Sequence, residues 1–264
     1  RASRPTWRGR LFCMEENGPM TSSILILGGT AEARSLADAL TDCGTRVLSS
    51  LAGRVQNPVL PAGEVRVGGF GGVDGLVRWL VKNRPAAVVD ATHPFAANIS
   101  ANAVAACART RVPLLRLERP GWSEHTLADT WRWVDSMESV CQAMESLGTR
   151  PLITTGRQGL DHYGHWRERW ALVRVVDPPE NPPAAWEILC RRGPFDLDTE
   201  RRLMREHDID VLTTKDSGGS LTEPKLRAAH DLGVQVIIVR RPTPPEVDVV
   251  NTVDAATRWV LERA

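Results

Sequence analysis

Residues 23–34 read SILILGGTAEAR, a short apolar run that ends in two glycines and continues into small and polar residues. Beyond this stretch, apolar residues recur at the i, i+3, i+4, i+7 spacing of a helix with one buried face. These residues are Ala33, Leu36, Ala37 and Leu40. Gly44 then provides a C-terminal cap. We therefore predict a strand at 23–27, a glycine turn and a helix.

The alternation of strand and helix continues to residue 117. Further strands are expected at 46–50, 65–67, 86–90 and 114–117, with helices at 73–81 and up to about 109. The run at 86–90 is apolar without interruption, which is typical of a parallel strand covered on both faces. Repeated units of this kind predict an α/β fold built on a doubly wound, Rossmann-like parallel sheet.

A proline and a glycine at 120–121 interrupt this pattern, and the alternation resumes after residue 133. The expected strands are 151–154, 171–176, 188–190, 211–214 and 234–240, and the expected helices are 136–147, 199–206, 222–232 and 254–262. We predict an NADP-binding domain at 20–118 and a second α/β domain, binding the substrate, at 119–264. Since ligands of doubly wound sheets bind beyond the carboxyl ends of the strands, we expect the active site in the cleft between the two halves.

The charge balance excludes several classes of function. With 33 basic and 32 acidic residues, the formal net charge is +1, so the surface is not built to coat nucleic acid. No apolar run approaches the roughly 20 residues of a membrane span.

Only Lys82, Lys215 and Lys225 are lysines. The many arginines reflect either a coding bias or, at some positions, bidentate anion recognition.

The cysteines and the N-terminal residues indicate a cytoplasmic protein. The five cysteines are widely spaced with no C-x-x-C pair, as expected of reduced thiols rather than a disulfide framework or a zinc site. Residues 1–19 lack the apolar stretch of a signal peptide. We predict that they form a disordered extension.

The first candidate site is the glycine turn. Glycines let the backbone approach a pyrophosphate, and the helix that follows offers free N–H groups. The pattern departs from G-x-G-x-x-G, because Thr30 and Ala33 replace the later glycines. Its place between a strand and a helix favours phosphate binding over a purely structural turn. The expected cofactor contacts are Gly28, Gly29, Thr30, Glu32 and Arg34.

The end of the next strand bears on the choice of cofactor. NAD-binding sheets carry an Asp or Glu at the end of this strand, about 20 residues after the glycine turn, but here no carboxylate occurs between the start of the strand and Glu64. Ser50 and Arg54 occupy this region, which favours the 2′-phosphate of NADP, unless Arg54 is only a solvated loop charge. We therefore expect NADPH. Its further contacts are expected at Ala52, Gly53, Gly69 and Thr92.

The strand at 86–90 is followed by a third candidate pattern, DATHPF at 90–95. Thr92 and His93 at a strand end are placed to contact a ribose or a nicotinamide, and His93 is a candidate general acid. The alternative is that one of them only caps a helix in which Pro94 is the first residue. The sequence leaves both interpretations open.

Loops after strands of the second half could together form an anion-binding wall. Lys215 ends one strand and precedes a loop rich in N–H donors. We expect Lys215 to be catalytic. The expected substrate contacts are Thr155, Gly156, Arg157, Arg191, Gly193, Ser217, Gly218 and Gly219. The alternative is a set of unrelated surface turns.

Two closely spaced histidines, His162 and His165, resemble a pair of metal ligands. Apart from Asp161, no carboxylate or cysteine lies nearby in the sequence to complete the ligand set. We therefore expect no metal.

Taken together, the motifs resemble the precorrin-6A reductase family of cobalamin biosynthesis. The resemblance runs in unchanged order from about residue 20 to the C-terminus, which makes it specific although each motif alone is modest. The motifs are ILILGGTAEAR at 24–34, SSLAGR at 49–54, GGFGG at 68–72, DATHPF at 90–95, TTGR at 154–157, RGPF at 192–195 and TKDSGG at 214–219.

The resemblance implies a reductase that transfers hydride from NADPH to precorrin-6A, removes its C18–C19 double bond and gives precorrin-6B. A proton is added at the neighbouring carbon, from Lys215, His93 or water. The carboxylates of such a tetrapyrrole suit a wall rich in arginine and N–H groups. The neighbouring enzymes of the pathway are candidate partners. Asp216 is given no catalytic charge, since the family carries Asp or Asn there.

Other functions fit part of the same pattern. One is an NADH-dependent cobalt-precorrin-6A reductase of the anaerobic pathway, and another is a different NADP-dependent enzyme on the same scaffold. A third is a non-catalytic NADPH-binding sensor. A sensor has no need of a second anion-binding wall, so the loops of the second half favour an enzyme.

Overall fold

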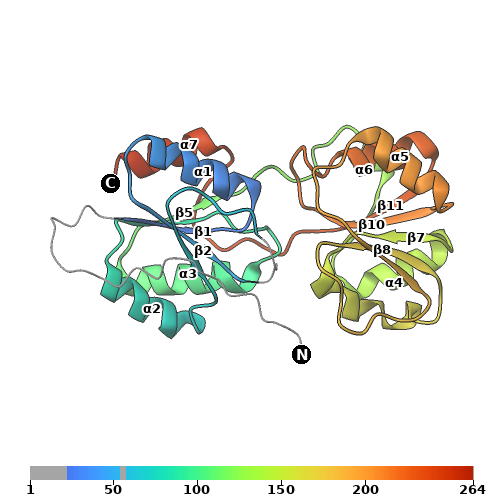
Figure 1. Ribbon diagram of the computed structural model, residues 1–264, viewed down its shortest axis with the longest axis horizontal. Helices are drawn as coiled ribbons and strands as arrows, with labels where there is room; N and C mark the ends of the chain where they lie inside the picture. The colour runs from blue at the N-terminus through green and yellow to red at the C-terminus, as the bar shows by residue number, and fades with distance from the viewer. Residues whose placement is uncertain (1–22, 54–57, 264) are drawn as a thin grey trace, which may run out of the picture.

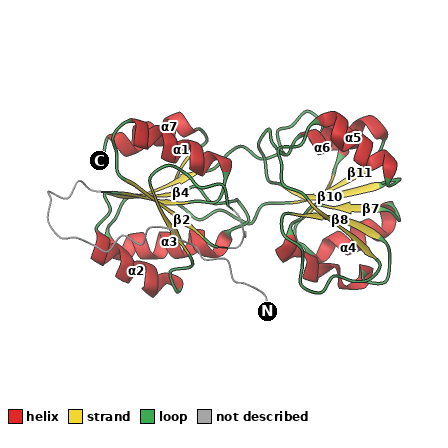
Figure 2. Cartoon of the chain, viewed as in Figure 1, coloured by secondary structure: helices red, strands yellow, loops and turns green. Residues whose placement is uncertain are grey.

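Two parallel sheets, each covered by helices on both faces, make up the protein (Figure 1, Figure 2). The computed structural model describes residues 23–53 and 58–263. The extension expected at 1–19 and the candidate cofactor residue Arg54 lie outside the described residues. Each sheet has six strands, and all the pairings are parallel. The predicted class, α/β with two Rossmann-like doubly wound sheets, is confirmed.

The first sheet has the strand order β3-β2-β1-β4-β5-β12. Its strands are β1 (Ile24–Leu27), β2 (Val47–Leu51), β3 (Glu64–Val67), β4 (Ala87–Asp90), β5 (Leu114–Leu117) and β12 (Asp248–Val250). Helices α1 (Ala31–Asp42) and α7 (Val253–Leu261) cover one face, and α2 (Gly72–Asn83) and α3 (Ala97–Thr110) cover the other (Figure 1). The order reverses between β1 and β4, whose carboxyl ends we call the first switch point. Ligands of doubly wound sheets bind at such points.

The second sheet has the order β9-β8-β7-β10-β11-β6. Its strands are β6 (Arg132–Val134), β7 (Pro151–Ile153), β8 (Ala171–Val175), β9 (Trp186–Cys190), β10 (Val211–Lys215) and β11 (Gln235–Val239). Helices α5 (Leu197–Glu206) and α6 (Pro224–Leu232) lie on one face, and α4 (Glu138–Leu147) with the 3-10 helix η2 (Arg157–Trp166) on the other. A short 3-10 helix, η1 (Ala128–Thr130), precedes β6. The carboxyl ends of β7 and β10 form the second switch point.

The apolar pattern of the sequence explains the first strand and helix. All four residues of β1 are at most 1% exposed, and α1 buries the four apolar residues predicted to face the sheet. Burying a leucine contributes about 2 kcal/mol. The Thr30 hydroxyl accepts a hydrogen bond from the Ala33 amide at 3.1 Å and so caps the helix. The helix therefore begins directly beyond β1, where a bound phosphate would lie.

The end of the chain returns to the first half. Strand β12 pairs with β5, and helix α7 packs against α1. The prediction that the second domain runs to residue 264 is therefore wrong for the segment 248–261. The sequence pattern could not reveal this, because the pairing partner of a strand is chosen by tertiary packing. The chain passes between the halves twice, after β5 and after β11.

Candidate functional site

The glycine turn lies at the first switch point. Gly29 has φ 114°, in the region that favours glycine, and a side chain there would meet nothing within 4 Å. Thr30 accepts from the Ala33 amide and donates to the Ala91 carbonyl at 2.7 Å, which joins the ends of β1 and β4. The amides of Ala31 and Glu32, at the start of α1, have no intrahelical acceptor. An open turn followed by free amides fits a pyrophosphate.

Glu32 and Arg34 face different surroundings. The Glu32 carboxylate accepts a hydrogen bond from Arg119 at 2.6 Å, so this acidic residue ties α1 to the connection between the halves. Arg34 is half-buried and pairs with no other described residue. Of these two residues, only Arg34 is therefore available to bind an anion beside the turn.

The carboxyl end of β2 carries two serines. Ser50 lies beside the glycine turn, because its carbonyl accepts from the Gly28 amide at 3.0 Å. The Ser49 hydroxyl is buried without a hydrogen-bond partner. Ala52 and Gly53 follow as exposed residues. The sequence interpretation missed Arg66 on β3, whose Nη1 lies 3.4 Å from the Ser50 hydroxyl and whose Nη2 donates to the Gly69 carbonyl at 2.7 Å.

Thr92 does not cap a helix. Its hydroxyl donates to the Asp90 carboxylate at 2.6 Å, and its amide donates to the same oxygen at 3.1 Å. Helix α3 begins only at Ala97, behind an Ala96 N-cap that has no side-chain hydrogen bond. The capping alternative for Thr92 and His93 is therefore wrong. Both residues lie instead in the loop that follows β4, at the first switch point.

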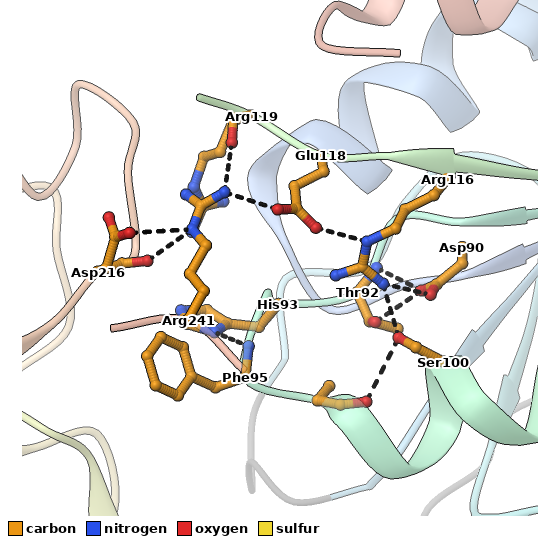
Figure 3. A network of polar contacts seen from close by, with 11 residues as sticks. Asp90, Thr92, His93, Phe95, Ser100, Arg116, Glu118, Arg119, Asp216 and Arg241 are labelled. Atoms are coloured by element: carbon orange, nitrogen blue, oxygen red, sulfur yellow. Dashed lines mark hydrogen bonds and ion pairs between the residues drawn. The ribbon is translucent and has the colours of Figure 1, made fainter. Parts of the chain in front are cut away.

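His93 is held neutral by its surroundings. Its Nδ1 accepts a hydrogen bond from the Phe95 amide at 3.2 Å, which leaves Nε2 as the N–H donor (Figure 3). Burial, with the positive charges of Arg119, Lys215, Arg241 and Lys225, lowers the pKa of His93 to about 3. The imidazolium that a general acid would need is thus absent at neutral pH.

Two lysines of the second half face this histidine. Lys215, the last residue of β10, lies with its Nζ 5.1 Å from the centre of the Phe95 ring, and burial lowers its pKa. Lys225 lies in the first turn of α6, and its Nζ donates to the Thr154 hydroxyl at 3.3 Å. Burial, with the charge of Arg174, lowers the pKa of Lys225 to about 7. No role was assigned to Lys225 from the sequence.

Other loop residues predicted to bind substrate are spread along the second sheet. Thr155 is buried and hydrogen-bonds to the Tyr163 hydroxyl at 3.2 Å, so its side chain is engaged inside the domain. Gly156 and the exposed Arg157 follow at the start of η2. Arg191 and Gly193 are exposed beyond the edge strand β9, two strands from β7. The structure therefore does not bring them to the second switch point.

The loop 217–219 packs against the connection between the halves. The Ser217 carbonyl accepts from Arg119 Nε at 2.6 Å. Gly218 has φ 64°, and a Cβ there would lie 2.1 Å from the Pro120 carbonyl oxygen. A Cβ on Gly219 would lie 2.9 Å from Arg119 and 3.7 Å from Glu32. This loop thus lies beside the glycine turn of the first half.

A chain of alternating charges joins the two switch points (Figure 3). Arg116 pairs with the buried Asp90 at 2.8 Å and with Glu118 at 2.5 Å. Arg241 pairs with Glu118 at 2.7 Å, contacts the Asp216 carboxylate at 3.5 Å and donates to the Asp216 carbonyl at 2.9 Å. The sequence interpretation did not find this network, because directly paired members lie up to 123 residues apart. Asp216 has a structural partner set, in line with the absence of an assigned catalytic charge.

The two histidines considered for a metal site are His162 and His165. His162 lies 3.0 Å from the Glu138 carboxylate, and no group of three or more His, Cys, Asp or Glu among the described residues is arranged to hold a metal ion. Within the described part of the chain, no helix is long and apolar enough to cross a membrane.

The fold and the first switch point define the class of protein: a two-domain α/β protein with a dinucleotide-type turn opposite a cationic strand edge. The family described as "Precorrin-6x reductase CbiJ/CobK" matches residues 23–261. The chain belongs to this family, and it is thus an oxidoreductase of cobalamin biosynthesis that needs a nicotinamide cofactor. The resemblance seen in the sequence is confirmed.

Individual relatives support the same assignment. The chain is 48% identical over 241 residues to a precorrin-6A reductase of Rhodococcus erythropolis, covering 90% of this chain and 96% of the relative. It is 44% identical over 240 residues to that of Mycobacterium tuberculosis H37Rv, with the same coverage. A cobalt-precorrin-6A reductase of Salmonella typhimurium is 30% identical over 84% of this chain and 88% of its own length. A solved CobK precorrin-6A reductase matches with a TM-score of 0.85 and 38% identity, covering 92% and 97% of the two chains.

Proposed function

We propose that this protein reduces the C18–C19 double bond of precorrin-6A to give precorrin-6B, with NADPH as the hydride donor. The observation that carries this proposal is the set of cations around His93, which are Arg119, Lys215, Arg241 and Lys225. These cations face the first switch point, where we place the nicotinamide, from the side of the second half. A macrocycle with several carboxylates needs such a surface, whereas a cofactor sensor does not. The higher identity to precorrin-6A reductases than to the Salmonella cobalt-precorrin-6A reductase favours the metal-free substrate.

The first half provides the cofactor side of the site. The turn at Gly28 and Gly29 and the first amides of α1 bind the pyrophosphate, and Thr92 contacts the ribose next to the nicotinamide. His93 presents its Nε2–H as a neutral hydrogen-bond donor. When bound, the cofactor supplies a hydride from its nicotinamide ring. The absence of a carboxylate at the end of β2 favours NADPH over NADH.

The second half provides the substrate side. Lys215 attracts carboxylates of the ring toward the first switch point, and the loop 217–219 holds the wall against α1. Since His93 is neutral, we assign Lys215 as the donor of the proton that is added to the ring carbon. Water then reprotonates Lys215. Holding ring and nicotinamide in contact is the main catalytic task, because hydride transfer requires near-contact geometry.

The test is cofactor oxidation by the full chain with precorrin-6A, measured as loss of NADPH absorbance. We expect oxidation that depends on precorrin-6A and is faster with NADPH than with NADH. Cobalt-precorrin-6A is offered in a parallel assay, and faster turnover of it would assign the anaerobic activity instead. Tight NADPH binding without turnover of either ring would favour the sensor.

A further inference from the structure

Two segments of the chain join the halves, and they contact each other. The first connection, residues 118–131, leads from β5 to β6, and the second connection, residues 240–247, leads from β11 to β12. The second connection has prolines at 242, 244 and 245. Because proline fixes φ, this segment has few conformations of its own. The orientation of the halves therefore depends on how the two connections are held at the residues that precede these prolines.

Arg241 holds three segments together with one side chain (Figure 3). Its Nη1 donates to the Glu118 carboxylate at 2.7 Å and to the Arg119 carbonyl at 2.9 Å, both in the first connection. Its Nε donates to the Asp216 carbonyl at 2.9 Å, in the loop that follows β10. The side chain is 15% exposed, so water competes little for these contacts. Since Arg241 belongs to the second connection, it joins both connections to the second switch point.

The partners of this guanidinium lead to both switch points. The Glu118 carboxylate also pairs with Arg116 at 2.5 Å, and Arg116 pairs with Asp90, the last residue of β4, at 2.8 Å. On the other side, Asp216 directly follows Lys215, the last residue of β10. The end of β4 and the end of β10 are therefore linked through a continuous series of ion pairs and hydrogen bonds.

The segments around the guanidinium are packed too closely to slide past each other. A Cβ on Gly121, in the first connection, would lie 2.8 Å from the Asp216 carboxylate and 3.3 Å from Arg241 Cζ. A Cβ on Gly218 would lie 2.1 Å from the Pro120 carbonyl oxygen. Glycine permits these approaches because it has no side chain. The first connection and the loop after β10 thus meet backbone to backbone, with Arg241 beside them.

From these contacts we infer that Arg241 is a positioning residue for hydride transfer. By tying both connections to the loop after β10, it fixes the distance between the nicotinamide at the first switch point and the ring held by the second half. The inference rests on the proposed function for the placement of cofactor and ring in opposite halves. Arg241 acts through the relative position of the halves and contacts neither ligand. Such a role matters for the rate, because a misplacement of about 1 Å can slow a reaction about 100-fold.

The first experiment measures the position of the halves without any turnover. Cys43, at the end of α1, and Cys190, at the end of β9, are exposed cysteines in opposite halves, and the other two described cysteines are buried. Spin labels on these two thiols, in a full chain that carries Cys13→Ser, report the distance between the halves by double electron–electron resonance. We expect one narrow distance distribution in this background and a broad one when Arg241→Met is added.

Arg240→Met is the matched control, because Arg240 is the neighbouring arginine of the same connection. It pairs with Asp135 at 3.2 Å, and its guanidinium lies 4.9 Å from the centre of the Trp133 ring, so both of these contacts stay within the second half. We expect its distance distribution to equal that of the wild type. Thermal melting checks that every variant is folded.

Gly121→Ala disturbs the same contacts while Arg241 keeps its charge and its donors. The added methyl group would displace the Asp216 carboxylate and the guanidinium, so we expect a broadened distribution here as well. Should Arg241→Met fail to fold, this variant and Arg241→Lys decide the question. Arg241→Lys keeps the charge without the fork that reaches several acceptors, and it should broaden the distribution less than Arg241→Met.

Single-turnover kinetics test the consequence for the reaction. The enzyme with bound NADPH is mixed with saturating precorrin-6A, and slower oxidation of NADPH that is deuterated at both C4 positions identifies the observed step as hydride transfer. We expect Arg241→Met to lower its rate constant about 10- to 100-fold, with the affinity for NADPH within about 3-fold of the wild type. A merely structural role would reduce the amplitude, through loss of folded enzyme, and leave the rate constant unchanged.

The two readouts separate this inference from the proposed function. An unchanged distance distribution in Arg241→Met, or an unchanged rate constant for hydride transfer, would overturn the inference. Absence of precorrin-6A turnover in the wild type would overturn the proposed function instead, and the distance measurement would still show whether Arg241 fixes the halves.

Discussion

The two switch points follow one topology but present different chemistry. At the first, α1 begins directly after the glycine turn, and backbone amides provide the positive end. At the second, α6 begins only at Pro224, and the cations are the side chains of Lys215 and Lys225. A pyrophosphate can approach the backbone closely, whereas carboxylates spread around a macrocycle need longer arms. The same fold can therefore bind a compact anion or a dispersed set of anions by exchanging amides for side chains.

The two regions also treat their charges differently. The buried charges of the first switch point are compensated, since Asp90 and Arg116 pair with each other at 2.8 Å. Lys215 forms no ion pair with any described residue, and Lys225 is buried with a hydroxyl as its hydrogen-bond partner. Compensated charges indicate a structural role, and uncompensated positive charges indicate a site that can bind an anion.

Breaking the compensated pair should have the largest effect on stability. Arg116→Met leaves Asp90 buried without its cation, and we expect the free energy of unfolding to fall by about 3–5 kcal/mol. Denaturant unfolding measures this loss. Arg109→Met is the control, since Arg109 pairs with Asp74 on the surface, where an ion pair contributes at most about 1 kcal/mol. Similar losses in the two variants would mean that the buried pair has no special structural role.

Removing the uncompensated amine of Lys225 should raise the free energy of unfolding instead of lowering it. Because burial lowers the pKa of Lys225 to about 7 from the usual 10.5, the folded state is penalised for the charged form. The penalty is complete below about pH 7 and disappears as the pH rises toward 10.5. Lys225→Met should therefore raise the free energy of unfolding by on the order of 3 kcal/mol at neutral pH and below.

Thermal melting at a series of pH values checks this prediction for Lys225. The gain in melting temperature should shrink steadily toward alkaline pH. Lys82→Met, at an exposed lysine of α2, should show no such dependence. A Lys225→Met variant that is less stable than the wild type at every pH would show that the amine is a structural element like the Asp90–Arg116 pair.

The smallest of these changes in free energy is expected for Lys215→Met, which tests whether the two halves have separate roles. Lys215→Met should lower kcat/KM for precorrin-6A about 100-fold, or roughly 2–3 kcal/mol, with NADPH binding unchanged. Single-substrate kinetics and NADPH titration measure the two quantities, with Lys82→Met again as the control. If NADPH binding is lost instead, Lys215 belongs to the cofactor side, and the division between the switch points fails.

Most of the architecture could be predicted from local patterns. The apolar run of β1, the spacing in α1 and the uninterrupted run of β4 each reflect burial, which the sequence records directly. Strand β12 was missed because Asp248–Val250 is short and largely exposed, so its pattern carries no signal of pairing.

The candidate site was predicted in outline but not in its electrostatics. The turn and the strand-end loops follow from chain order, since carboxyl ends of parallel strands meet at one edge. The neutral state of His93 depends on its burial and on four cations, all from beyond residue 118, and the position of Arg66 depends on the register between two strands. Such properties arise only when distant segments meet, so the residue types alone could not reveal them.

The return of the chain to its first sheet has a consequence for how the protein is made. The ribosome releases residues in order, and β5 gains its neighbour β12 only after almost the whole chain has emerged. Until then, the first half has an uncovered strand edge, which is prone to pair wrongly. A premature stop near residue 247 would therefore damage the half that is synthesised first and leave the strand set of the second half complete.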